Sequence, residues 1–478
     1  MAESIAFLLN GLERVTLSPA PDLTILEFLR QQRRLTGTKE GCAEGDCGTC
    51  TVAIGEAQDG RLQWKAVNAC IAMASQLDGK LLVTVEGLAE GAVLHPVQRA
   101  MVDNHASQCG FCTPGFVMAL FARFHNGPYE DDSDIHDALA GNLCRCTGYR
   151  PIVDAARSAL KGERADRFGA KEQEIVAALA GLADEPPRSA SDGEGRTALP
   201  HSLAELKAAL AKNPDAVLLA GGTDLGLDVT KRGKRWRSVV SLAGVGELTR
   251  IEAREDGLSI GAAATYADIL PHLAPFGESV ETLLRRLGSR QIRNLGTIGG
   301  NIANASPIGD TLPLLLALDA RFLLDGTAGA RSIAASDFFT GYRKTVLRSG
   351  EFIASIELDR LRENEGVRVD KISRRFDQDI SAVCGAIFWR MEAGVLADVR
   401  IAFGGMADRP KRARSGEAAL RGQPVSETAF ETAAAVLSRD FSPLSDFRGS
   451  AAFRMTSAQN LMRAWAEAVA QSAPGGAI

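Results

Sequence analysis

The segment that decides the interpretation of this chain is Gly41-Cys-Ala-Glu-Gly-Asp-Cys-Gly-Thr-Cys50, a C-x4-C-x2-C pattern. A further cysteine, Cys70, follows at the end of a predicted strand. This spacing is that of plant-type [2Fe–2S] proteins, in which thiolates hold both irons. The glycines of the segment let its backbone adopt positive φ and approach a cluster closely. We therefore predict one cluster held by Cys42, Cys47, Cys50 and Cys70.

A second group of cysteines forms two close pairs, Cys109-x2-Cys112 and Cys144-x-Cys146. Each pair comes directly before a predicted helix, and prolines 114 and 151 are early helical residues. Helix N-termini favour thiolates and the negative charge of a cluster. If both loops lie at the same end of a helical bundle, they can close on a second [2Fe–2S] cluster.

Disulfides and structural zinc are the alternative uses of these cysteines. Disulfides are unusual in a reducing cytoplasm, and zinc sites seldom use C-x4-C-x2-C or C-x-C spacing. The eight cysteines before residue 147 form two complete four-ligand sets, which favours two [2Fe–2S] clusters. The remaining cysteine, Cys384, lies in an apolar predicted strand, where we expect a buried core residue.

The composition is that of a globular protein with several domains. The chain has 478 residues, 45% hydrophobic and 24% charged, with a net charge of −5. No long basic run is present, which argues against nucleic-acid and anionic-membrane partners. No apolar run of about 20 residues suits a membrane span. The first ten residues lack the basic start of a secretion signal, so we expect a cytoplasmic protein.

The cysteine-rich front of the chain has the pattern of a small α+β domain followed by helices. Strand patterns on either side of Asn10-Gly11 predict a β-hairpin with a type I′ turn. Asp22 is expected to cap a helix that runs to about Arg34, and short strands follow. Four segments with helical periodicity between residues 96 and 160 predict a small bundle.

The rest of the chain contains only one cysteine. Residues 162–200 include Glu185-Pro186-Pro187 and a stretch rich in serine, glycine and charge, which indicates a linker with a short helix over 172–182. From Ser202 the pattern is mixed α/β. Alternating strands near 380–403 and alanine-rich helices follow.

Two motifs carry a family resemblance: Gln108-Cys-Gly-Phe-Cys-Thr-Pro-Gly115 and Gly141-Asn-Leu-Cys-Arg-Cys-Thr-Gly-Tyr-Arg-Pro151. They resemble the second-cluster motifs of the molybdenum hydroxylases, and the segment 41–50 resembles their first-cluster motif. Outside the linker, the whole chain resembles the small subunits of bacterial xanthine dehydrogenases, in which a two-cluster domain is fused to an FAD domain.

This resemblance implies a multidomain α+β fold. The expected parts are a β-grasp ferredoxin-like domain (1–87), a four-helix two-iron cluster domain (88–162), a linker (163–195), a vanillyl-alcohol-oxidase/PCMH-type α+β FAD domain (196–366) and a C-terminal α+β domain like that of CO dehydrogenase flavoproteins (367–478).

Two glycine-rich segments in the centre of the chain, 218–225 and 297–301, lack the Rossmann G-x-G-x-x-G pattern. Paired glycines can present N–H groups to a pyrophosphate, but they also serve turns and packing. The resemblance implies that both segments hold FAD, so a bulky residue at Gly299 should block backbone approach. The expected cofactor contacts are Leu218, Leu219, Ala220, Gly221, Gly222, Thr223, Asp224, Leu225, Leu287, Thr297, Ile298, Gly299, Gly300, Asn301, Asp310, Ile353 and Lys371.

Within this set the resemblance implies particular roles. Asp310 would accept hydrogen bonds from the adenosine side, and Lys371 and Ile353 would lie by the flavin. Leu287 stands where animal members have a phenylalanine, so it cannot stack on the flavin in the same way. Animal members also have asparagine in place of Gly222, which a backbone-binding loop should tolerate.

Two further residues are assigned by resemblance. Asp379 ends the charged segment 374–379 and would tune flavin electrostatics, the alternative being a solvated turn. Gln108 precedes the first ligand of the second set and would meet the pterin of a partner subunit. The alternative for Gln108 is a hydrogen bond within its own loop.

The resemblance implies an electron-transfer subunit. A molybdopterin-binding large subunit would oxidise hypoxanthine and xanthine to urate, with an α2β2 assembly, and substrate hydroxylation would not occur on this chain. Electrons would pass through the second cluster and then the first to FAD and NAD⁺. The alternatives are a subunit of an aldehyde- or N-heterocycle-oxidising molybdenum hydroxylase, a stand-alone NADH-driven reductase and a zinc-bound scaffold.

Overall fold

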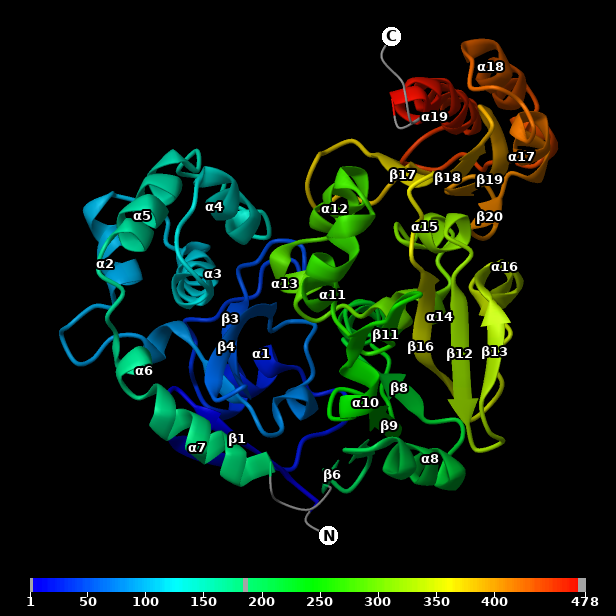
Figure 1. Ribbon diagram of the computed structural model, residues 1–478. Coiled ribbons are helices and arrows are strands. Elements are labelled where there is room, and N and C mark those ends of the chain that lie inside the picture. Colours follow the sequence, from blue (N-terminus) through cyan, green and yellow to red (C-terminus); the bar gives the residue numbers. More distant parts are fainter. Residues whose placement is uncertain (1–2, 184–187, 472–478) are drawn as a thin grey trace. The chain divides into compact units, whose positions relative to one another are not determined.

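A computed structural model describes residues 3–183 and 188–471 (Figure 1). Its contacts divide the chain into two units, Met1–Gly246 with Gly288–Gly296, and Glu247–Leu287 with Thr297–Ile478. Among the described residues, no helix is both long enough and apolar enough to cross a bilayer. Residues 184–187 of the predicted linker and 472–478 of the predicted C-terminal domain lie outside the described residues.

The first unit begins with a five-stranded sheet of order β2-β1-β5-β3-β4. β1 and β5 are parallel, and the other neighbours are antiparallel. Phe7 and Val52 of the sheet pack in one core with Phe28 and Leu29 of the crossing helix. The elements are β1 (Ile5–Leu9), β2 (Glu13–Leu17), α1 (Ile25–Glu27), η1 (Phe28–Gln32), β3 (Thr51–Gln58), β4 (Arg61–Asn68), η2 (Ala74–Leu77), β5 (Leu81–Val83) and η3 (Val85–Gly87).

Two details of this domain correct the sequence predictions. The hairpin is present, but Leu9 pairs with Glu13, so the turn has a third residue and is not the two-residue type I′ turn. The helix is capped by Thr24, whose hydroxyl accepts a first-turn N–H at 3.1 Å. Asp22 is not the cap, because its carboxylate instead accepts a hydrogen bond from Arg235 at 3.0 Å.

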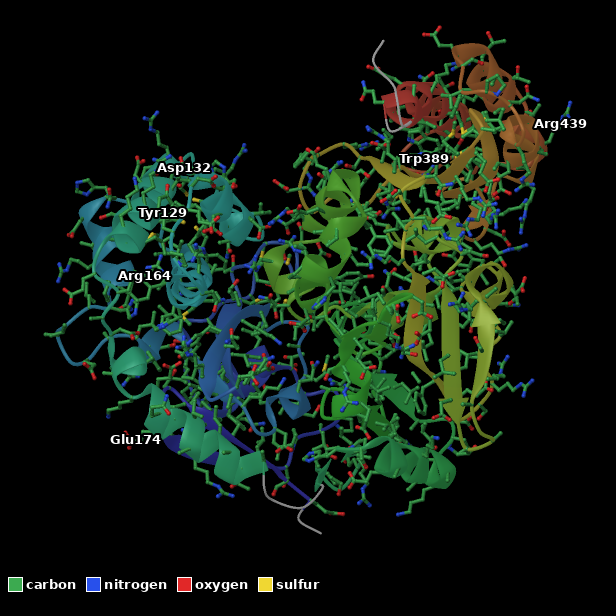
Figure 2. All side chains as sticks on the ribbon, in the orientation of Figure 1. Tyr129, Asp132, Arg164, Glu174, Trp389 and Arg439 are labelled. Carbon is green, nitrogen blue, oxygen red and sulfur yellow. The ribbon has the colours of Figure 1, made fainter. Side chains whose placement is uncertain are left out.

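The four predicted helices of the next domain are present and pack around Phe116, Phe121 and Phe124. At the connection between the second and third of them, the Tyr129 hydroxyl donates to Asp132 at 2.8 Å (Figure 2). The helices are α2 (Pro96–Asp103), α3 (Thr113–His125), α4 (Asp132–Leu139) and α5 (Arg150–Lys161).

Much of the segment predicted as a linker is folded. Helices α6 (Arg167–Ala170) and α7 (Glu172–Ala183) pack Phe168 and Leu179 into the core of the helical domain. Asp166, before α6, accepts hydrogen bonds from His95 at 3.0 Å and His125 at 3.1 Å. The apolar face of α7 explains this packing, which the composition of the segment concealed.

The first unit also holds a four-stranded sheet of order β6-β7-β9-β8, whose last three strands are parallel. The segment 288–296 belongs to the same unit. The elements are β6 (Arg188–Ser191), β7 (Arg196–Leu199), α8 (Leu203–Lys212), β8 (Val217–Leu219), α9 (Leu225–Thr230), β9 (Ser238–Ser241) and α13 (Arg290–Arg293). Residues 196–366, predicted as one FAD domain, therefore contribute to both units.

The second unit has an antiparallel five-stranded sheet of order β10-β11-β16-β12-β13 over a core that includes Tyr266, Phe322 and Phe338. Its elements are α10 (Gly246–Thr249), β10 (Ile251–Ala253), β11 (Gly257–Gly261), α11 (Tyr266–Leu273), η4 (Ala274–Phe276), α12 (Glu278–Arg285), α14 (Ile298–Asn304), α15 (Leu312–Ala317), β12 (Arg321–Gly326), β13 (Arg331–Ala334), α16 (Ala335–Phe338), β14 (Phe339–Gly341), β15 (Lys344–Thr345) and β16 (Glu351–Asp359).

A second sheet of this unit, β17-β18-β19-β20, is the predicted meander. Alternation along β18 places Trp389 in the core with the C-terminal helices (Figure 2) and Phe388 in the core with α15. The multidomain α+β organisation is confirmed. The elements are β17 (Glu365–Ile372), β18 (Val383–Glu392), β19 (Val395–Gly404), β20 (Lys411–Arg412), α17 (Arg414–Leu420), α18 (Glu427–Ala435), η5 (Leu437–Arg439) and α19 (Ala451–Gln471).

Candidate functional site

The first cysteine set lies in the loop before β3 and just after β4. The Cys47 N–H donates to the Cys42 sulfur at 3.3 Å, and hydrogen bonds between thiols join Cys42 to Cys70 and Cys70 to Cys50. The bonds from Cys47 and Cys70 hold the pKa of the Cys42 thiol well below its usual range. The structure thus brings together the four thiols that the spacing singled out.

The loop around this set depends on glycine. Gly45 and Gly48 have φ of 78° and 65°, in the left-handed region. A Cβ at Gly41 would lie 2.9 Å from the Cys47 sulfur. Asn68, at the end of β4, donates to the Gly45 carbonyl at 2.8 Å. The loop is therefore held closely around the thiols by backbone conformation and one buried amide.

The second set lies in the loops that lead into α3 and α5, and Cys146 comes three residues before Tyr149, the N-cap residue of α5. Cys112 is the N-cap residue of α3, and the sulfurs of Cys109 and Cys146 are 3.6 Å apart. Burial and a hydrogen bond with Cys144 raise the pKa of the Cys112 thiol to about 12. Thr147 approaches the Cys144 sulfur with its hydroxyl at 3.2 Å and its N–H at 3.5 Å.

The chemistry of both donor sets fits a [2Fe–2S] cluster. All nine cysteines lie in the described part of the chain and are free thiols, so neither set is used in disulfides. Each set also has a backbone N–H directed at a sulfur, an interaction that tunes thiolate-bound clusters. Cys384 is fully buried in β18, which confirms the expectation of a core residue.

The two sets differ in exposure. Cys109 and Cys146 are exposed, whereas Cys50 and Cys70 are only 2% exposed. Gln108 is exposed, and its side chain makes no hydrogen bond to any described residue, so the alternative of a bond within its own loop is not observed. Large apolar side chains are exposed near the second set: Phe111, Leu143 and Tyr149.

The glycine-rich loop 218–225 belongs to the first unit and follows β8. Gln76 donates to the carbonyls of Ala220 at 3.1 Å and Gly221 at 3.4 Å. Gly221 and Gly222 are buried, and their N–H groups donate to no acceptor among the described residues. Because buried donors without acceptors are costly, this loop fits an anionic ligand such as a diphosphate.

The loop 297–301 belongs to the second unit and begins α14. The N–H groups of residues 298–301 all donate within the chain, to acceptors on Ala262, Ala264 and Thr297. In this conformation the described loop has no such N–H left for a pyrophosphate. A Cβ at Gly299 would lie 2.5 Å from that of Ala262, so a bulky residue there disrupts packing whether or not flavin is bound.

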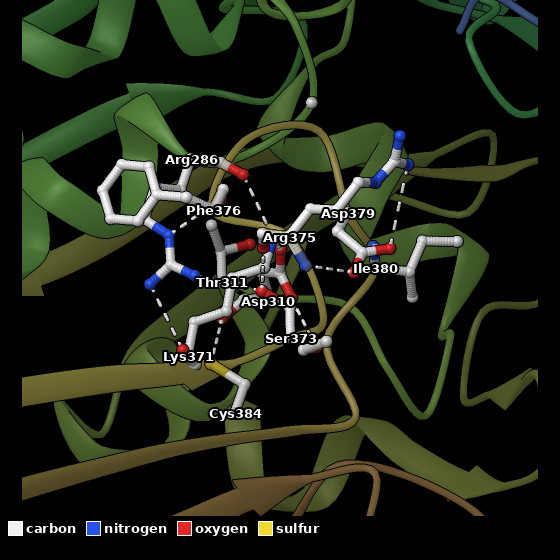
Figure 3. A network of polar contacts seen from close by, with 12 residues as sticks. Arg286, Asp310, Thr311, Lys371, Ser373, Arg375, Phe376, Asp379, Ile380 and Cys384 are labelled. Atoms are coloured by element: carbon white, nitrogen blue, oxygen red, sulfur yellow. Dashed lines mark hydrogen bonds and ion pairs between the residues drawn. The ribbon is translucent and has the colours of Figure 1, made fainter. Parts of the chain in front are cut away.

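Asp310 and Lys371 belong to a buried polar network in the second unit (Figure 3). Asp310 accepts from Lys371 at 2.6 Å and, through its other oxygen, from Ser381 at 2.6 Å. Two other predicted flavin residues lie in the apolar core of this unit, Ile353 as a buried member and Leu287 partly buried against it. These four predicted flavin residues are thus held by contacts within the second unit.

Arg286, which follows α12, holds the segment after β17. Its guanidinium donates to the Lys371 carbonyl at 3.2 Å, the Ser373 hydroxyl at 3.0 Å and the Phe376 carbonyl at 3.1 Å (Figure 3). It also lies 4.5 Å from the centroid of the Phe376 ring, a cation–π distance. One cation therefore fixes both ends of this short segment.

Asp379 shapes the same charged segment. Its carboxylate accepts the N–H groups of Arg374 at 2.8 Å and Arg375 at 2.9 Å (Figure 3). Burial opposes ionisation, but these hydrogen bonds and the charge of Arg375 outweigh it and lower the pKa of Asp379. The segment 374–379 is thus a turn organised by this carboxylate.

Sequence reasoning missed several residues that shape these sites. Asn68 lies two positions before Cys70, which is a signal that could have been noticed. Arg286, Ser381 and Gln76 carry no such signal, because each reaches a partner distant in the sequence. A cavity of about 680 Å³ in the second unit, lined mainly by charged residues of 359–365 and 390–400, contains none of the predicted site residues.

Known proteins resemble this chain over most of its length. Xanthine dehydrogenase 2 of Arabidopsis thaliana is 34% identical over 90% of this chain and 37% of its own length. Xanthine dehydrogenase/oxidase of Rattus norvegicus is 33% identical over 85% of this chain and 34% of its own length. The chain therefore spans about a third of these relatives.

Two solved structures are matched over almost the whole of their own chains. Carbon monoxide dehydrogenase from Hydrogenophaga pseudoflava is 28% identical with a TM-score of 0.55, over 57% of this chain and 96% of that chain. Quinoline 2-oxidoreductase from Pseudomonas putida 86 is 30% identical with a TM-score of 0.53, over 57% and 95%.

Family models match successive parts of the chain: "2Fe-2S iron-sulfur cluster binding domain" (7–75), "[2Fe-2S] binding domain" (84–157), "FAD binding domain in molybdopterin dehydrogenase" (193–359) and "CO dehydrogenase flavoprotein C-terminal domain" (369–469). Together with the thiol sets, these matches define a chain of iron–sulfur and FAD-binding domains. The chain belongs to the molybdenum hydroxylase family.

Proposed function

We propose that this chain is the electron-transfer subunit of a xanthine dehydrogenase. A partner, the molybdopterin-binding large subunit, oxidises hypoxanthine and xanthine to urate in an α2β2 assembly. The similarity to xanthine dehydrogenases supports this proposal, because it extends over iron–sulfur and flavin regions together, 90% of this chain in the Arabidopsis relative. The family models matched are iron–sulfur and FAD-binding domains, which supports a partner as the site of hydroxylation.

One observation carries the direction of transfer. The second set, in which Cys109 and Cys146 are exposed, is joined to the first set by a direct hydrogen bond from the Leu143 N–H to the Cys47 carbonyl at 3.0 Å. Leu143 immediately precedes the ligand Cys144. An entry set with exposed ligands, followed by a set with none exposed, is the arrangement expected of a relay. We infer that electrons enter at the second set, pass to the first, and leave through FAD to NAD⁺.

The chain's own residues would hold the cofactors. FAD, when bound, supplies the chemistry that joins one-electron and two-electron transfer. The segments 218–225 and 297–301, with Leu287, Asp310, Ile353 and Lys371, are its proposed contacts, and 297–301 would take part other than through the N–H groups of residues 298–301, which donate within the chain. Asp379 would tune the electrostatics near the flavin. The ligands are Cys42, Cys47, Cys50 and Cys70 for one cluster and Cys109, Cys112, Cys144 and Cys146 for the other.

The surface around the second set is the proposed contact with the partner. Gln108 is exposed there beside apolar side chains, and its amide offers both donor and acceptor. It would meet the pterin of the large subunit. An exposed patch of this kind is typical of a protein–protein contact.

A second candidate is the corresponding subunit of another molybdenum hydroxylase. The similarity to quinoline 2-oxidoreductase and carbon monoxide dehydrogenase favours it. It differs from the first proposal in the substrate of the partner, so the two are separated by an assay of the assembled enzyme.

The test is to purify the chain with the molybdopterin protein encoded beside it and to compare substrates. Xanthine-dependent NAD⁺ reduction above the rates with quinoline and aldehydes supports the first proposal. Turnover of an N-heterocycle or aldehyde without xanthine activity supports the second. Stoichiometric zinc instead of iron and sulfide in the purified chain contradicts both.

A further inference from the structure

A short segment distant in sequence lies against both cysteine loops of the first unit. It is 288–296, which contains α13 and groups with this unit although its sequence neighbours on both sides belong to the other. Arg290 and Arg293 pair with Asp137 at the end of α4, Arg290 at 2.8 Å. Asn294 donates to the Ala66 carbonyl of β4 at 2.8 Å. The segment is thus anchored to both cluster-binding domains.

Gln291, in the middle of this segment, is fully buried. Its amide nitrogen donates to the Asn142 side chain at 2.8 Å and to the Thr51 hydroxyl at 3.3 Å. Asn142 lies two residues before Cys144, and Thr51 directly follows Cys50. One amide therefore bridges the loop of one thiol set and the loop of the other.

The bridge converges on one carbonyl. Both Asn142, at 2.9 Å, and Thr51, at 2.6 Å, donate to the Gly48 carbonyl, inside the first cysteine loop. The same region is packed without space: a Cβ at Gly115 would lie 2.2 Å from the Gly48 carbonyl, and one at Gly141 would lie 2.0 Å from the Gln291 side chain. The contact from Leu143 to the Cys47 carbonyl lies beside these bonds in the sequence.

The side chain of Gln291 is retained at an energetic cost. Its amide oxygen is buried and has no hydrogen-bond partner in the described part of the chain. A buried polar atom without a partner is destabilising, and an apolar side chain of similar size would avoid it. The donor function of the amide toward Asn142 and Thr51 is a physical reason for a glutamine here.

We propose that Gln291 is a positioning residue for electron exchange between the two cluster sites. It orders Asn142 and Thr51, and these hold the loops so that Leu143 stays hydrogen-bonded to the Cys47 carbonyl. In the exchange, one electron leaves the reduced group at the second set and reduces the oxidised group at the first, and no proton is required. This inference rests on the proposed function, because it needs both clusters.

The test compares isosteric variants of the holoprotein. Gln291→Met keeps the length of the side chain and removes its hydrogen bonds, and Thr51→Val keeps the shape and removes the shared hydroxyl. Arg290→Met is the control, because it removes an anchor of the same segment while Arg293 keeps Asp137 paired. Iron and sulfide content shows whether both clusters are retained.

Two readouts report on the contact itself. One is the magnetic interaction between the clusters in low-temperature EPR of the fully reduced protein, and the other is the exchange rate after flash reduction of one cluster. For Gln291→Met and Thr51→Val we expect a weaker magnetic interaction and an exchange rate lower by about tenfold. Tenfold is about the factor that corresponds to the free energy of one lost buried hydrogen bond. Arg290→Met should match the unmodified protein.

Both readouts unchanged in Gln291→Met and Thr51→Val, with full cluster content, would overturn the inference. An equal fall in Arg290→Met would also overturn it, because the effect would then belong to the segment and not to the amide. If Gln291→Met loses iron, its readouts cannot be interpreted, and the readouts of Thr51→Val then decide whether the inference holds. Absence of a cluster from the unmodified protein would instead contradict the proposed function.

Discussion

Asp310 and Lys371 form a buried ion pair, with 2.6 Å between a carboxylate oxygen and the ammonium nitrogen. The Lys371 side chain is 1% exposed, and its remaining hydrogen bond goes to the Arg286 carbonyl at 3.0 Å. Ser381 occupies the other oxygen of Asp310. The pair ties β17 to the turn before α15, so two residues assigned to the flavin also hold the second unit together.

Replacing Lys371 with methionine should destabilise the protein. The Asp310 carboxylate would stay buried without its counter-charge, and breaking such a pair costs about 3–5 kcal/mol. Thermal unfolding of the holoprotein measures the loss. The double variant Lys371→Met, Asp310→Asn should recover part of it, because no charge is then left uncompensated. Unchanged stability of Lys371→Met would show that the pair is dispensable.

The first glycine loop offers a test of flavin binding that the second does not. Gly222 has φ of 76°, and a Cβ there would lie 3.2 Å from the Leu219 side chain. Gly222→Asn should retain FAD, since asparagine tolerates this conformation, whereas Gly222→Val adds strain of about 1–2 kcal/mol and should lower FAD content. Gly233→Val is the control, because Gly233 has φ of 62° but open surroundings. Full FAD in Gly222→Val would argue against this loop.

The sequence predicted the features whose signal lies within a few neighbouring residues, and it failed where a distant residue decides the structure. The spacing from Cys42 to Cys50 and the prolines in the first turns of α3 and α5 are local signals, and the structure brings the thiols of each set together. By residue type, Asp22 and Thr24 are equally suited to cap a helix. Only the ion pair with the distant Arg235 shows that the Asp22 carboxylate is engaged elsewhere and that Thr24 is the cap.

Contacts between distant segments were beyond local patterns. The pairing of Asp310 with Lys371 and the placement of Gln291 between two cysteine loops depend on tertiary packing. The glycines of 297–301 show a different case. The sequence pattern is present as noted, but helix packing, and not only ligand binding, explains why glycine is needed there. Gly299 allows α14 to approach Ala262, so packing within the unit explains it without a ligand.

Lys231 should raise the reduction potential of the first cluster. Its ammonium donates to the Cys42 carbonyl at 2.5 Å and lies 3.2 Å from Glu44. A positive charge favours the reduced, more negative cluster, so Lys231→Met should lower the potential by about 20 mV, a modest shift because Lys231 is partly exposed. Redox titration followed by EPR measures this. Lys234→Met, which removes a surface lysine paired with Asp228, should leave the potential unchanged, and equal shifts in both variants would remove the local explanation.

The stability that Asp137 contributes should be constant near neutral pH. Burial raises its pKa, but the charges of Arg293 and Arg290 outweigh burial and lower it. A carboxyl whose folded pKa is lowered stabilises the fold above its unfolded pKa, near 4, and loses this as pH falls toward the folded value. Asp137→Asn leaves the Arg293 guanidinium, 2% exposed, without a counter-charge, at a cost of about 3 kcal/mol.

Unfolding measured from about pH 6 to about pH 9 should therefore show a constant difference between Asp137→Asn and the unmodified protein, and the difference should narrow only below about pH 4. Asp103→Asn, at an exposed aspartate of α2, is the control and should change stability little. A difference that grows as pH falls would mean that the sign of the Asp137 shift is wrong.

Gln108 is an exposed residue directly before the ligand Cys109, at the proposed contact with the partner subunit. Gln108→Leu keeps a similar size and removes the amide, which makes no hydrogen bond to the described part of this chain. If the amide meets the pterin, xanthine-dependent NAD⁺ reduction by the assembled enzyme should fall while clusters and FAD are retained. NADH-driven reduction of an artificial dye should stay nearly unchanged, because it needs only the flavin end. Gln63→Leu, an exposed glutamine on β4, is the matched control and should affect neither activity. If Gln108→Leu loses both activities together with iron, the residue supports its own loop, and the partner contact proposed at Cys109 and Cys146 loses this support.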